Sequence, residues 1–208
     1  MKRVTCLALL AWALLPLAAR ADRIPITNKF GSISISAPGI VSFGSQLIRF
    51  NGIVAPRGHS LGSVSFTTGV CLTNCTFDFF RSSTFSDVGS TFVVKGVGNF
   101  GAPKGVIFSG SFVGPIHWTL ISKNGANLVF QLRGRLKGQF YDGRVMDFVT
   151  NQTIVTTVGQ LAKGIGQVSG GRTRIPVPEP GSFGLFSTGL VRIAGVVWRR
   201  IAGGAKSH

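Results

Sequence analysis

Two glycine-rich motifs in the sequence contain residue types that could carry out chemistry. Residues 58–62 read G-H-S-L-G and match the pattern in which a serine hydrolase presents its nucleophile, here Ser60, on a sharp strand-to-helix turn. Residues 96–101 match G-x-G-x-x-G, the pattern of a dinucleotide-binding loop. Neither motif is followed by a helical pattern, because residues 63–68 alternate like a strand and Pro103 closely follows the second motif. We therefore interpret both motifs as turns.

The chain contains few residues that could act as general acids, general bases or metal ligands. Between residues 22 and 178 the only carboxylates are Asp22, Asp78, Asp87, Asp142 and Asp147. No two of them share a clear face, so the sequence predicts a protein that is not an enzyme and uses no cofactor or metal. A secreted hydrolase that uses Ser60 or a pair of Asp residues is the alternative.

Cys71 and Cys75 are predicted to form a disulfide. Residues four apart on a straight strand are about 13 Å apart, so the bond requires a turn at residues 72–74. Asn74 tolerates the left-handed conformation that a three-residue hairpin loop needs. A metal site would need two further ligands, and only His59 and His117 are available at unrelated positions.

The composition indicates a basic β protein. The chain has 208 residues with 29 Gly, 17 Phe and only 13% charged residues, and its single Glu argues against a helical bundle. Of 22 basic and 6 acidic residues, 15 and 5 lie between residues 22 and 178, so this body would attract polyanions. Alternatively, the charge serves only solubility.

Alternating apolar and polar residues predict antiparallel strands. They occur at residues 32–36, 62–67, 76–80, 91–97 and 106–113, and a three-stranded meander is predicted over residues 116–157. Its turns are Asn124-Gly125 and Asp142-Gly143, both typical of type I′ hairpins. The fold class is therefore all-β, an antiparallel β-sandwich or an open barrel.

A basic stripe follows one predicted strand of this meander. Between residues 128 and 140 the even positions are apolar or Gly, and the odd positions include Arg133, Arg135 and Lys137. Like charges about 7 Å apart on one strand face repel each other unless an anion or a counter-ion meets them. We interpret the stripe as a candidate contact with acidic polymer; the alternative is a solvated outer face.

The N-terminus predicts export. Basic residues, an apolar run and the cleavage pattern Ala19-Arg20-Ala21 make residues 1–21 a signal peptide, removed by signal peptidase after passage through the export translocon. An oxidising compartment then favours the disulfide. Residues 22–175 form the predicted extracytoplasmic β domain.

The C-terminus, residues 176–208, has three parts. A largely apolar stretch, residues 182–198, would form a single membrane helix of about 25 Å, which Arg192 makes marginal. Arg199 and Arg200 follow it and would stay on the cytoplasmic side. The motif that precedes it consists of Pro178, Glu179, Pro180 and Gly181.

This tail resembles the PEP-CTERM sorting signal of exported proteins of Gram-negative bacteria. The resemblance implies recognition by an exosortase, a membrane transpeptidase that cleaves near the motif, and a transient intermediate anchored in the inner membrane. It also implies delivery to the cell surface, the medium or a biofilm matrix, where acidic exopolysaccharide is a partner. No specific nucleic acid partner is expected. A permanently anchored structural envelope protein is the alternative.

Overall fold

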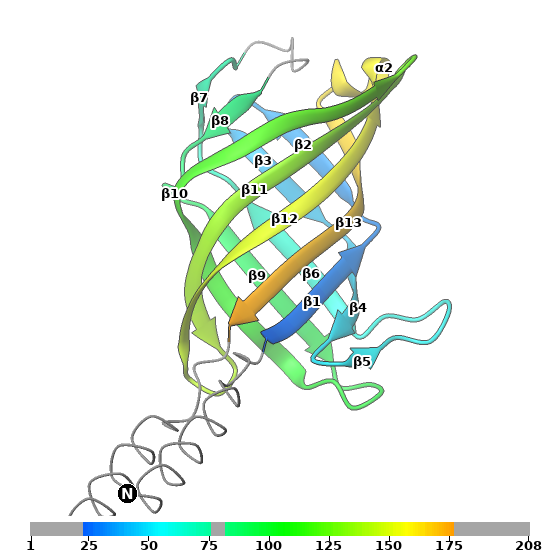
Figure 1. Ribbon diagram of the computed structural model, residues 1–208, viewed down its shortest axis with the longest axis vertical. Coiled ribbons are helices and arrows are strands. Elements are labelled where there is room, and N and C mark those ends of the chain that lie inside the picture. The colour runs from blue at the N-terminus through cyan, green and yellow to red at the C-terminus, as the bar shows by residue number, and fades with distance from the viewer. Residues whose placement is uncertain (1–22, 76–81, 177–208) are drawn as a thin grey trace, which may run out of the picture. The chain divides into compact units, whose positions relative to one another are not determined.

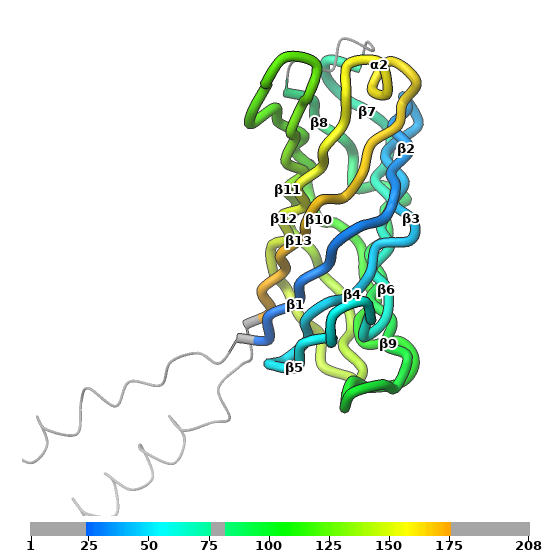
Figure 2. Tube along the Cα trace, turned by 90° about the vertical axis from the view of Figure 1, so that its right-hand side faces the viewer, coloured from blue at the N-terminus to red at the C-terminus, as the bar shows by residue number. Residues whose placement is uncertain are grey.

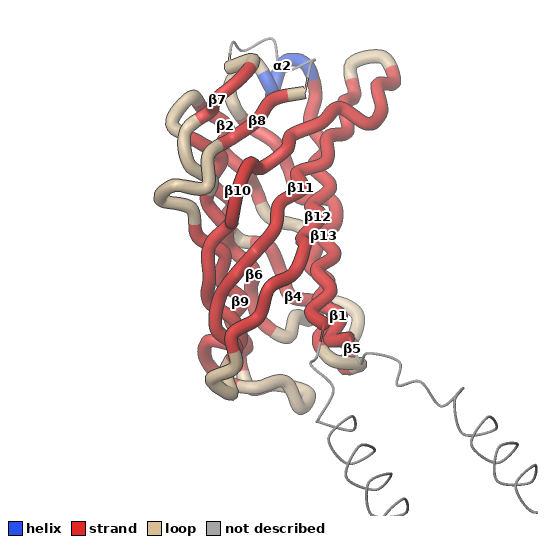
Figure 3. Tube along the Cα trace, turned by 60° about the vertical axis from the view of Figure 1, so that its left-hand side comes forward, coloured by secondary structure: helices blue, strands red, loops and turns tan. Residues whose placement is uncertain are grey.

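The computed structural model describes residues 23–75 and 82–176, and Arg23–Pro176 form one compact unit. The predicted signal peptide, the motif at residues 178–181, the predicted membrane segment with Arg199 and Arg200, and the predicted strand at residues 76–80 lie outside the described residues. Within these residues the chain is almost entirely strand, with one short helix at one end (Figure 3).

The described chain forms thirteen strands and the helix α2, Val158–Leu161. The strands are β1 (Arg23–Lys29), β2 (Ser32–Ser36), β3 (Gly39–Phe43), β4 (Ser45–Phe50), β5 (Ile53–Val54), β6 (Gly62–Thr67), β7 (Cys71–Thr73), β8 (Ser83–Phe85), β9 (Thr91–Val97), β10 (Lys104–Asn124), β11 (Asn127–Phe140), β12 (Val145–Thr157) and β13 (Ile165–Pro176).

Eight of these strands close into an antiparallel barrel. The ring runs β1, β4, β6, β9, β10, β11, β12, β13 and returns to β1. The first and last strands pair from Arg23 with Pro176 to Asn28 with Gly171. In Figure 1 the strands β11, β12, β13 and β1 lie side by side across the front of the barrel. The structure thus confirms the all-β antiparallel prediction and shows that the barrel is closed.

Two hairpins extend this ring. The β2–β3 hairpin joins β13 to β6, and β1 continues into β2 through a break at Phe30 and Gly31, which Figure 2 shows as one bent path. The β7–β8 hairpin lies against β10. These additions lengthen the wall at one end without opening it.

The predicted meander is present, but its turns differ from the type I′ prediction. Asn124 pairs with Asn127, and Gly125 has a positive φ of 58° while Asn124 does not. At the second turn Gly143 has a φ of 85°, and the Asp142 carboxylate accepts a hydrogen bond from the Arg144 amide at 3.1 Å. One glycine in each turn therefore supplies the left-handed residue, so the second residue with positive φ is not needed.

Aromatic side chains fill much of the barrel interior. The rings of Phe108 and Phe148 lie 4.9 Å apart, and Trp118 stacks on Phe130 at 4.6 Å. Trp118, Phe108 and Phe130 are fully buried. Each buried Phe contributes roughly 1.5–3 kcal/mol, so packing in the interior explains the Phe residues that the barrel buries.

A polar chain crosses the same interior. The Asn28 amide donates hydrogen bonds to Ser45 Oγ at 2.7 Å and to Gln152 Oε1 at 2.9 Å. Gln152 donates in turn to Thr150 Oγ1, whose hydroxyl lies 2.8 Å from that of Thr173. All five residues are buried, so these bonds link β1, β4, β12 and β13 where an unpaired polar group would be costly.

Gly171 provides the space for this chain, and we predict that Gly171→Ala destabilises the barrel. A Cβ at this position would lie 2.1 Å from both Asn28 Oδ1 and Gln152 Oε1. Overpacking of this kind costs about 1–3 kcal/mol, to be measured as a loss of unfolding free energy in urea. Gly170→Ala is the matched control, because a Cβ there meets nothing within 4 Å. Equal losses in the two variants would contradict this account.

Candidate functional site

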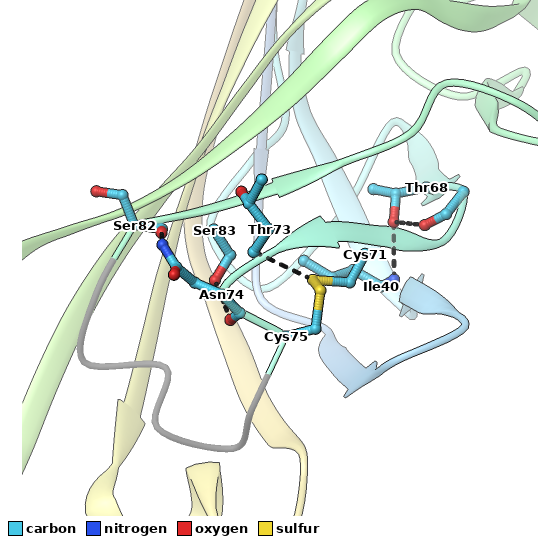
Figure 4. The surroundings of a disulfide bond; sticks show 9 residues. Ile40, Thr68, Cys71, Thr73, Asn74, Cys75, Ser82 and Ser83 are labelled. Atoms are coloured by element: carbon cyan, nitrogen blue, oxygen red, sulfur yellow. Dashed lines mark hydrogen bonds between the residues drawn. A yellow bond between two sulfur atoms is a disulfide. The ribbon is translucent and has the colours of Figure 1, made fainter.

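The Cys71–Cys75 disulfide is confirmed. Figure 4 shows the two sulfur atoms joined at the end of β7, with the Cα atoms 5.7 Å apart. Asn74 has the expected left-handed φ of 54°, but Cys71–Thr73 form strand β7 and not part of a three-residue loop. The Asn74 side-chain amide donates a hydrogen bond to the Ser82 carbonyl oxygen at 2.7 Å. The bond holds the edge hairpin rather than a site for chemistry.

One glycine of each catalytic-looking motif, Gly62 and Gly96, allows close packing of the backbone. Gly62 pairs with Gly96 across β6 and β9, and a Cβ on Gly62 would lie 1.8 Å from the Lys95 carbonyl oxygen. Ser60 lies in the loop before β6, and within residues 23–75 and 82–176 no hydrogen bond joins it to a His or an Asp. The neighbouring His59 ring packs edge-on against Phe100, with ring centroids 5.6 Å apart.

The described residues contain no group of three or more His, Cys, Asp or Glu side chains that could hold a metal ion. Among them there is also no helix long and apolar enough to cross a membrane.

The predicted stripe lies on the outer face of β11, as the alternation predicted, but its three cations differ in their surroundings. Arg133, Arg135 and Lys137 are all exposed. Arg135 donates two hydrogen bonds to Asp147 on β12, at 2.7 Å and 2.5 Å, and Lys137 is paired in register with Asp147. Arg133 alone among the three lines a surface groove.

The Arg135–Asp147 pair changes the titration of both groups. Hydrogen bonding to Arg135 lowers the pKa of the Asp147 carboxyl, and the charges of Arg135 and Lys137 lower it further. The same bond raises the pKa of Arg135. At neutral pH the pair is therefore fully ionised, and one of the two positive charges on this part of β11 is neutralised.

Arg133 belongs to a row of outward-facing side chains that crosses five strands. Arg133 pairs with Asn151, Asn151 with Arg172, Arg172 with Thr27, and Thr27 with Arg49. Cations therefore alternate with neutral polar groups along the row. Neighbouring strands lie 4.7–4.9 Å apart, so successive arginines are separated by roughly 10 Å.

A groove follows this row along the outer wall. It has a volume of about 1040 Å³, and its lining residues come from β1, β11, β12 and β13. Lys29 and Arg174 line it beside Arg133 and Arg172, and no lining residue is acidic. A second hollow of about 430 Å³ shares Lys29, Arg172 and Arg174 with it and adds Arg49. We call these two hollows together the basic groove.

No carboxylate among residues 23–75 and 82–176 forms an ion pair with the cations of the basic groove. The side chains of Lys29, Arg49, Arg133, Arg172 and Arg174 make no ion pair or hydrogen bond within the described part of the chain. Their separation is close to the Debye length of about 8 Å at physiological salt, so their repulsion is only partly screened. The arrangement favours binding of an extended anion.

Four of these five cations were missed by the sequence analysis. Arg172 and Arg174 do alternate with Thr173 and Ile175, and this period of two was the available signal for an outward-facing basic strand. Lys29 and Arg49 carry no comparable local signal. Only the closure of the barrel places them beside Arg133.

Comparison with known proteins identifies the tail. Residues 176–201 match the family model of the PEP-CTERM protein-sorting motif. No curated protein and no solved structure matches the chain. The chain thus carries the sorting motif that the sequence predicted, and the motif marks an exported protein that is sorted by an exosortase and ends at the cell surface.

We predict that Asp147→Asn strengthens binding of a sulfated polymer such as dextran sulfate, because it frees Arg135 beside the basic groove.

Acidification should also strengthen binding of dextran sulfate by the unmodified protein. Affinity should rise as the Asp147 carboxylate becomes protonated and releases Arg135. Because the pKa of Asp147 is lowered, this rise should occur below the ordinary carboxyl range near pH 4. Sulfate esters stay ionised there, so affinity can be measured by calorimetry from pH 6 downward. The Asp147→Asn variant should show a smaller rise, and an equal rise in both proteins would contradict the assignment.

Proposed function

We propose that this exported chain is a non-catalytic protein of the cell surface or extracellular matrix whose barrel binds anionic polymer in the basic groove. The observation that carries the proposal is the row of arginines that the barrel wall places in register, Arg133, Arg172 and Arg49, none of which is paired with an acid of the described chain. Basic residues that served only solubility would need neither this alignment nor a concave surface.

The length of the row favours a polymer over a small anion. Three arginines separated by roughly 10 Å cannot all contact one carboxylate or phosphate. A flexible chain with repeated charges can contact each in turn and release counter-ions as it binds. Binding of this kind weakens steeply as salt is added.

The sorting motif supports delivery of the barrel to the place where such polymers occur. In the proposed route, signal peptidase cleaves after Ala21, and the apolar segment after Gly181 holds an intermediate in the inner membrane. Arg199 and Arg200 set its orientation, and an exosortase then cleaves near Pro178, Glu179 and Pro180.

Intact mass spectrometry of protein recovered from producing cells tests this route. The membrane fraction should contain a form that begins near Asp22 and retains His208, and the surface or medium fraction should contain a form that ends near the motif. Changing Glu179 to Ala should block the second form. A mature protein that keeps His208 in every fraction would show instead that the chain is permanently anchored.

A charge-removal experiment tests the groove. The triple variant Arg133→Gln, Arg172→Gln, Arg174→Gln should bind dextran sulfate about threefold to a hundredfold more weakly at low salt, since each exposed ionic contact contributes about 0.2–1 kcal/mol. The dependence of log K on log salt should also become shallower.

The control for this experiment removes positive charge elsewhere. Lys95→Gln and Lys163→Gln alter exposed lysines that do not line the basic groove. Affinity should change little in this double variant. If the two variants lose affinity in proportion to the charge removed, net charge explains binding and the groove proposal is wrong.

A further inference from the structure

The basic groove continues beyond Arg49 into a third hollow. This hollow has a volume of about 510 Å³ and shares Lys29 and Ile48 with the second one. Lys29 therefore lines all three hollows. The third hollow is also lined by Phe30, His59 and Arg57, so aromatic side chains adjoin the arginines of the basic groove.

Phe30 is an unusual residue for its position. Its side chain is 61% exposed, and its backbone has a φ of 62°, in the left-handed region that is unfavourable for a bulky residue. The bend between β1 and β2 requires this backbone, since Gly31 follows with a φ of 89°. Gly or Asn would meet that requirement with less strain. The fold thus explains the backbone at residue 30 and leaves the exposed ring without a packing role.

We propose that the three hollows form one binding site for an acidic polysaccharide, with a sugar ring against Phe30 and carboxylates against the arginines. This inference rests on the proposed function and adds the class of polymer to it. The apolar face of a pyranose ring fits an exposed aromatic side chain, while its hydroxyl groups need hydrogen-bonding partners. A polymer without rings would gain nothing from Phe30.

The groups between the arginines fit such a chain. Thr27, Asn151, Thr153 and Gln131 line the groove and present hydroxyl and amide groups that can donate to or accept from sugar hydroxyls. The arginines recur at every second strand, roughly 10 Å apart. A glycan in which every second sugar is a uronic acid presents carboxylates at a similar interval.

Other polyanions fit the surface less well. Proteins bind single-stranded nucleic acid by stacking its bases on successive exposed aromatic side chains. The aromatic residue that lines the groove along the arginine row is Phe148, which is buried. A lipid surface would meet a flat or convex patch, whereas these cations line a groove. A single polysaccharide chain fits a concave groove and can place a sugar ring on the aromatic surface of the third hollow.

The test uses the processed protein and three polymers. Hyaluronan carries a uronate on every second sugar, polyacrylate carries carboxylates without rings, and dextran carries rings without charge. The unmodified protein should bind hyaluronan more tightly than polyacrylate of equal charge, and should bind dextran weakly. Phe30→Asn keeps a residue that tolerates the left-handed backbone and should weaken hyaluronan binding about fivefold without affecting polyacrylate.

The control is Phe43→Asn, which removes a ring that is 48% exposed and lines none of the three hollows. Thermal unfolding shows whether each variant is folded, and Phe30→Asn should be at least as stable as the unmodified protein. Unchanged hyaluronan affinity in folded Phe30→Asn, or tighter binding of polyacrylate by the unmodified protein, would overturn the polysaccharide inference and leave the polyanion groove in place. If neither charged polymer binds, the proposed function fails as well.

Discussion

The pairing of β1 with β13 is the interaction on which the rest of the structure depends. It joins residues almost at opposite ends of the described chain, from Arg23 with Pro176 to Asn28 with Gly171. Without it β1 and residues 171–176 of β13 would be exposed edges with unpaired backbone groups, which invite association with other chains. With it the sheet closes, and one set of side chains fills the interior while the other forms the outer wall.

The same pairing shapes both faces of the wall. Inside, Gly171 lacks a side chain, so the amides of Asn28 and Gln152 meet across β13. Outside, Arg172 is paired with Thr27 and lies in the row with Arg133 and Arg49. Because successive residues of a strand point to opposite faces, a shift of one residue would bury the arginines and expose the polar chain. The interior network therefore helps to hold the register that the groove requires.

The closing strand also leads directly into the sorting motif. β13 ends at Pro176, and the match to the PEP-CTERM motif begins at the same residue. Cleavage at the motif, beyond Pro176, would leave the pairing with Arg23 intact. The barrel and its groove can then keep their structure through processing, which a protein that acts after its release from the membrane requires.

The sequence by itself determined the local features. Alternation located β2, β6, β9 and β11 and assigned the inward and outward faces of β11. The short spacing of Cys71 and Cys75 indicated the disulfide, and the tail was readable as a linear motif. The tertiary structure decided which strands are neighbours. It brought Arg49 and Arg172 into the basic groove with Arg133 and placed Phe30 in the hollow that adjoins it. Strand alternation specifies a face within one strand, whereas the closure that sets Arg172 beside Thr27 pairs β1 with β13, whose partners are more than 100 positions apart, and no local pattern records it.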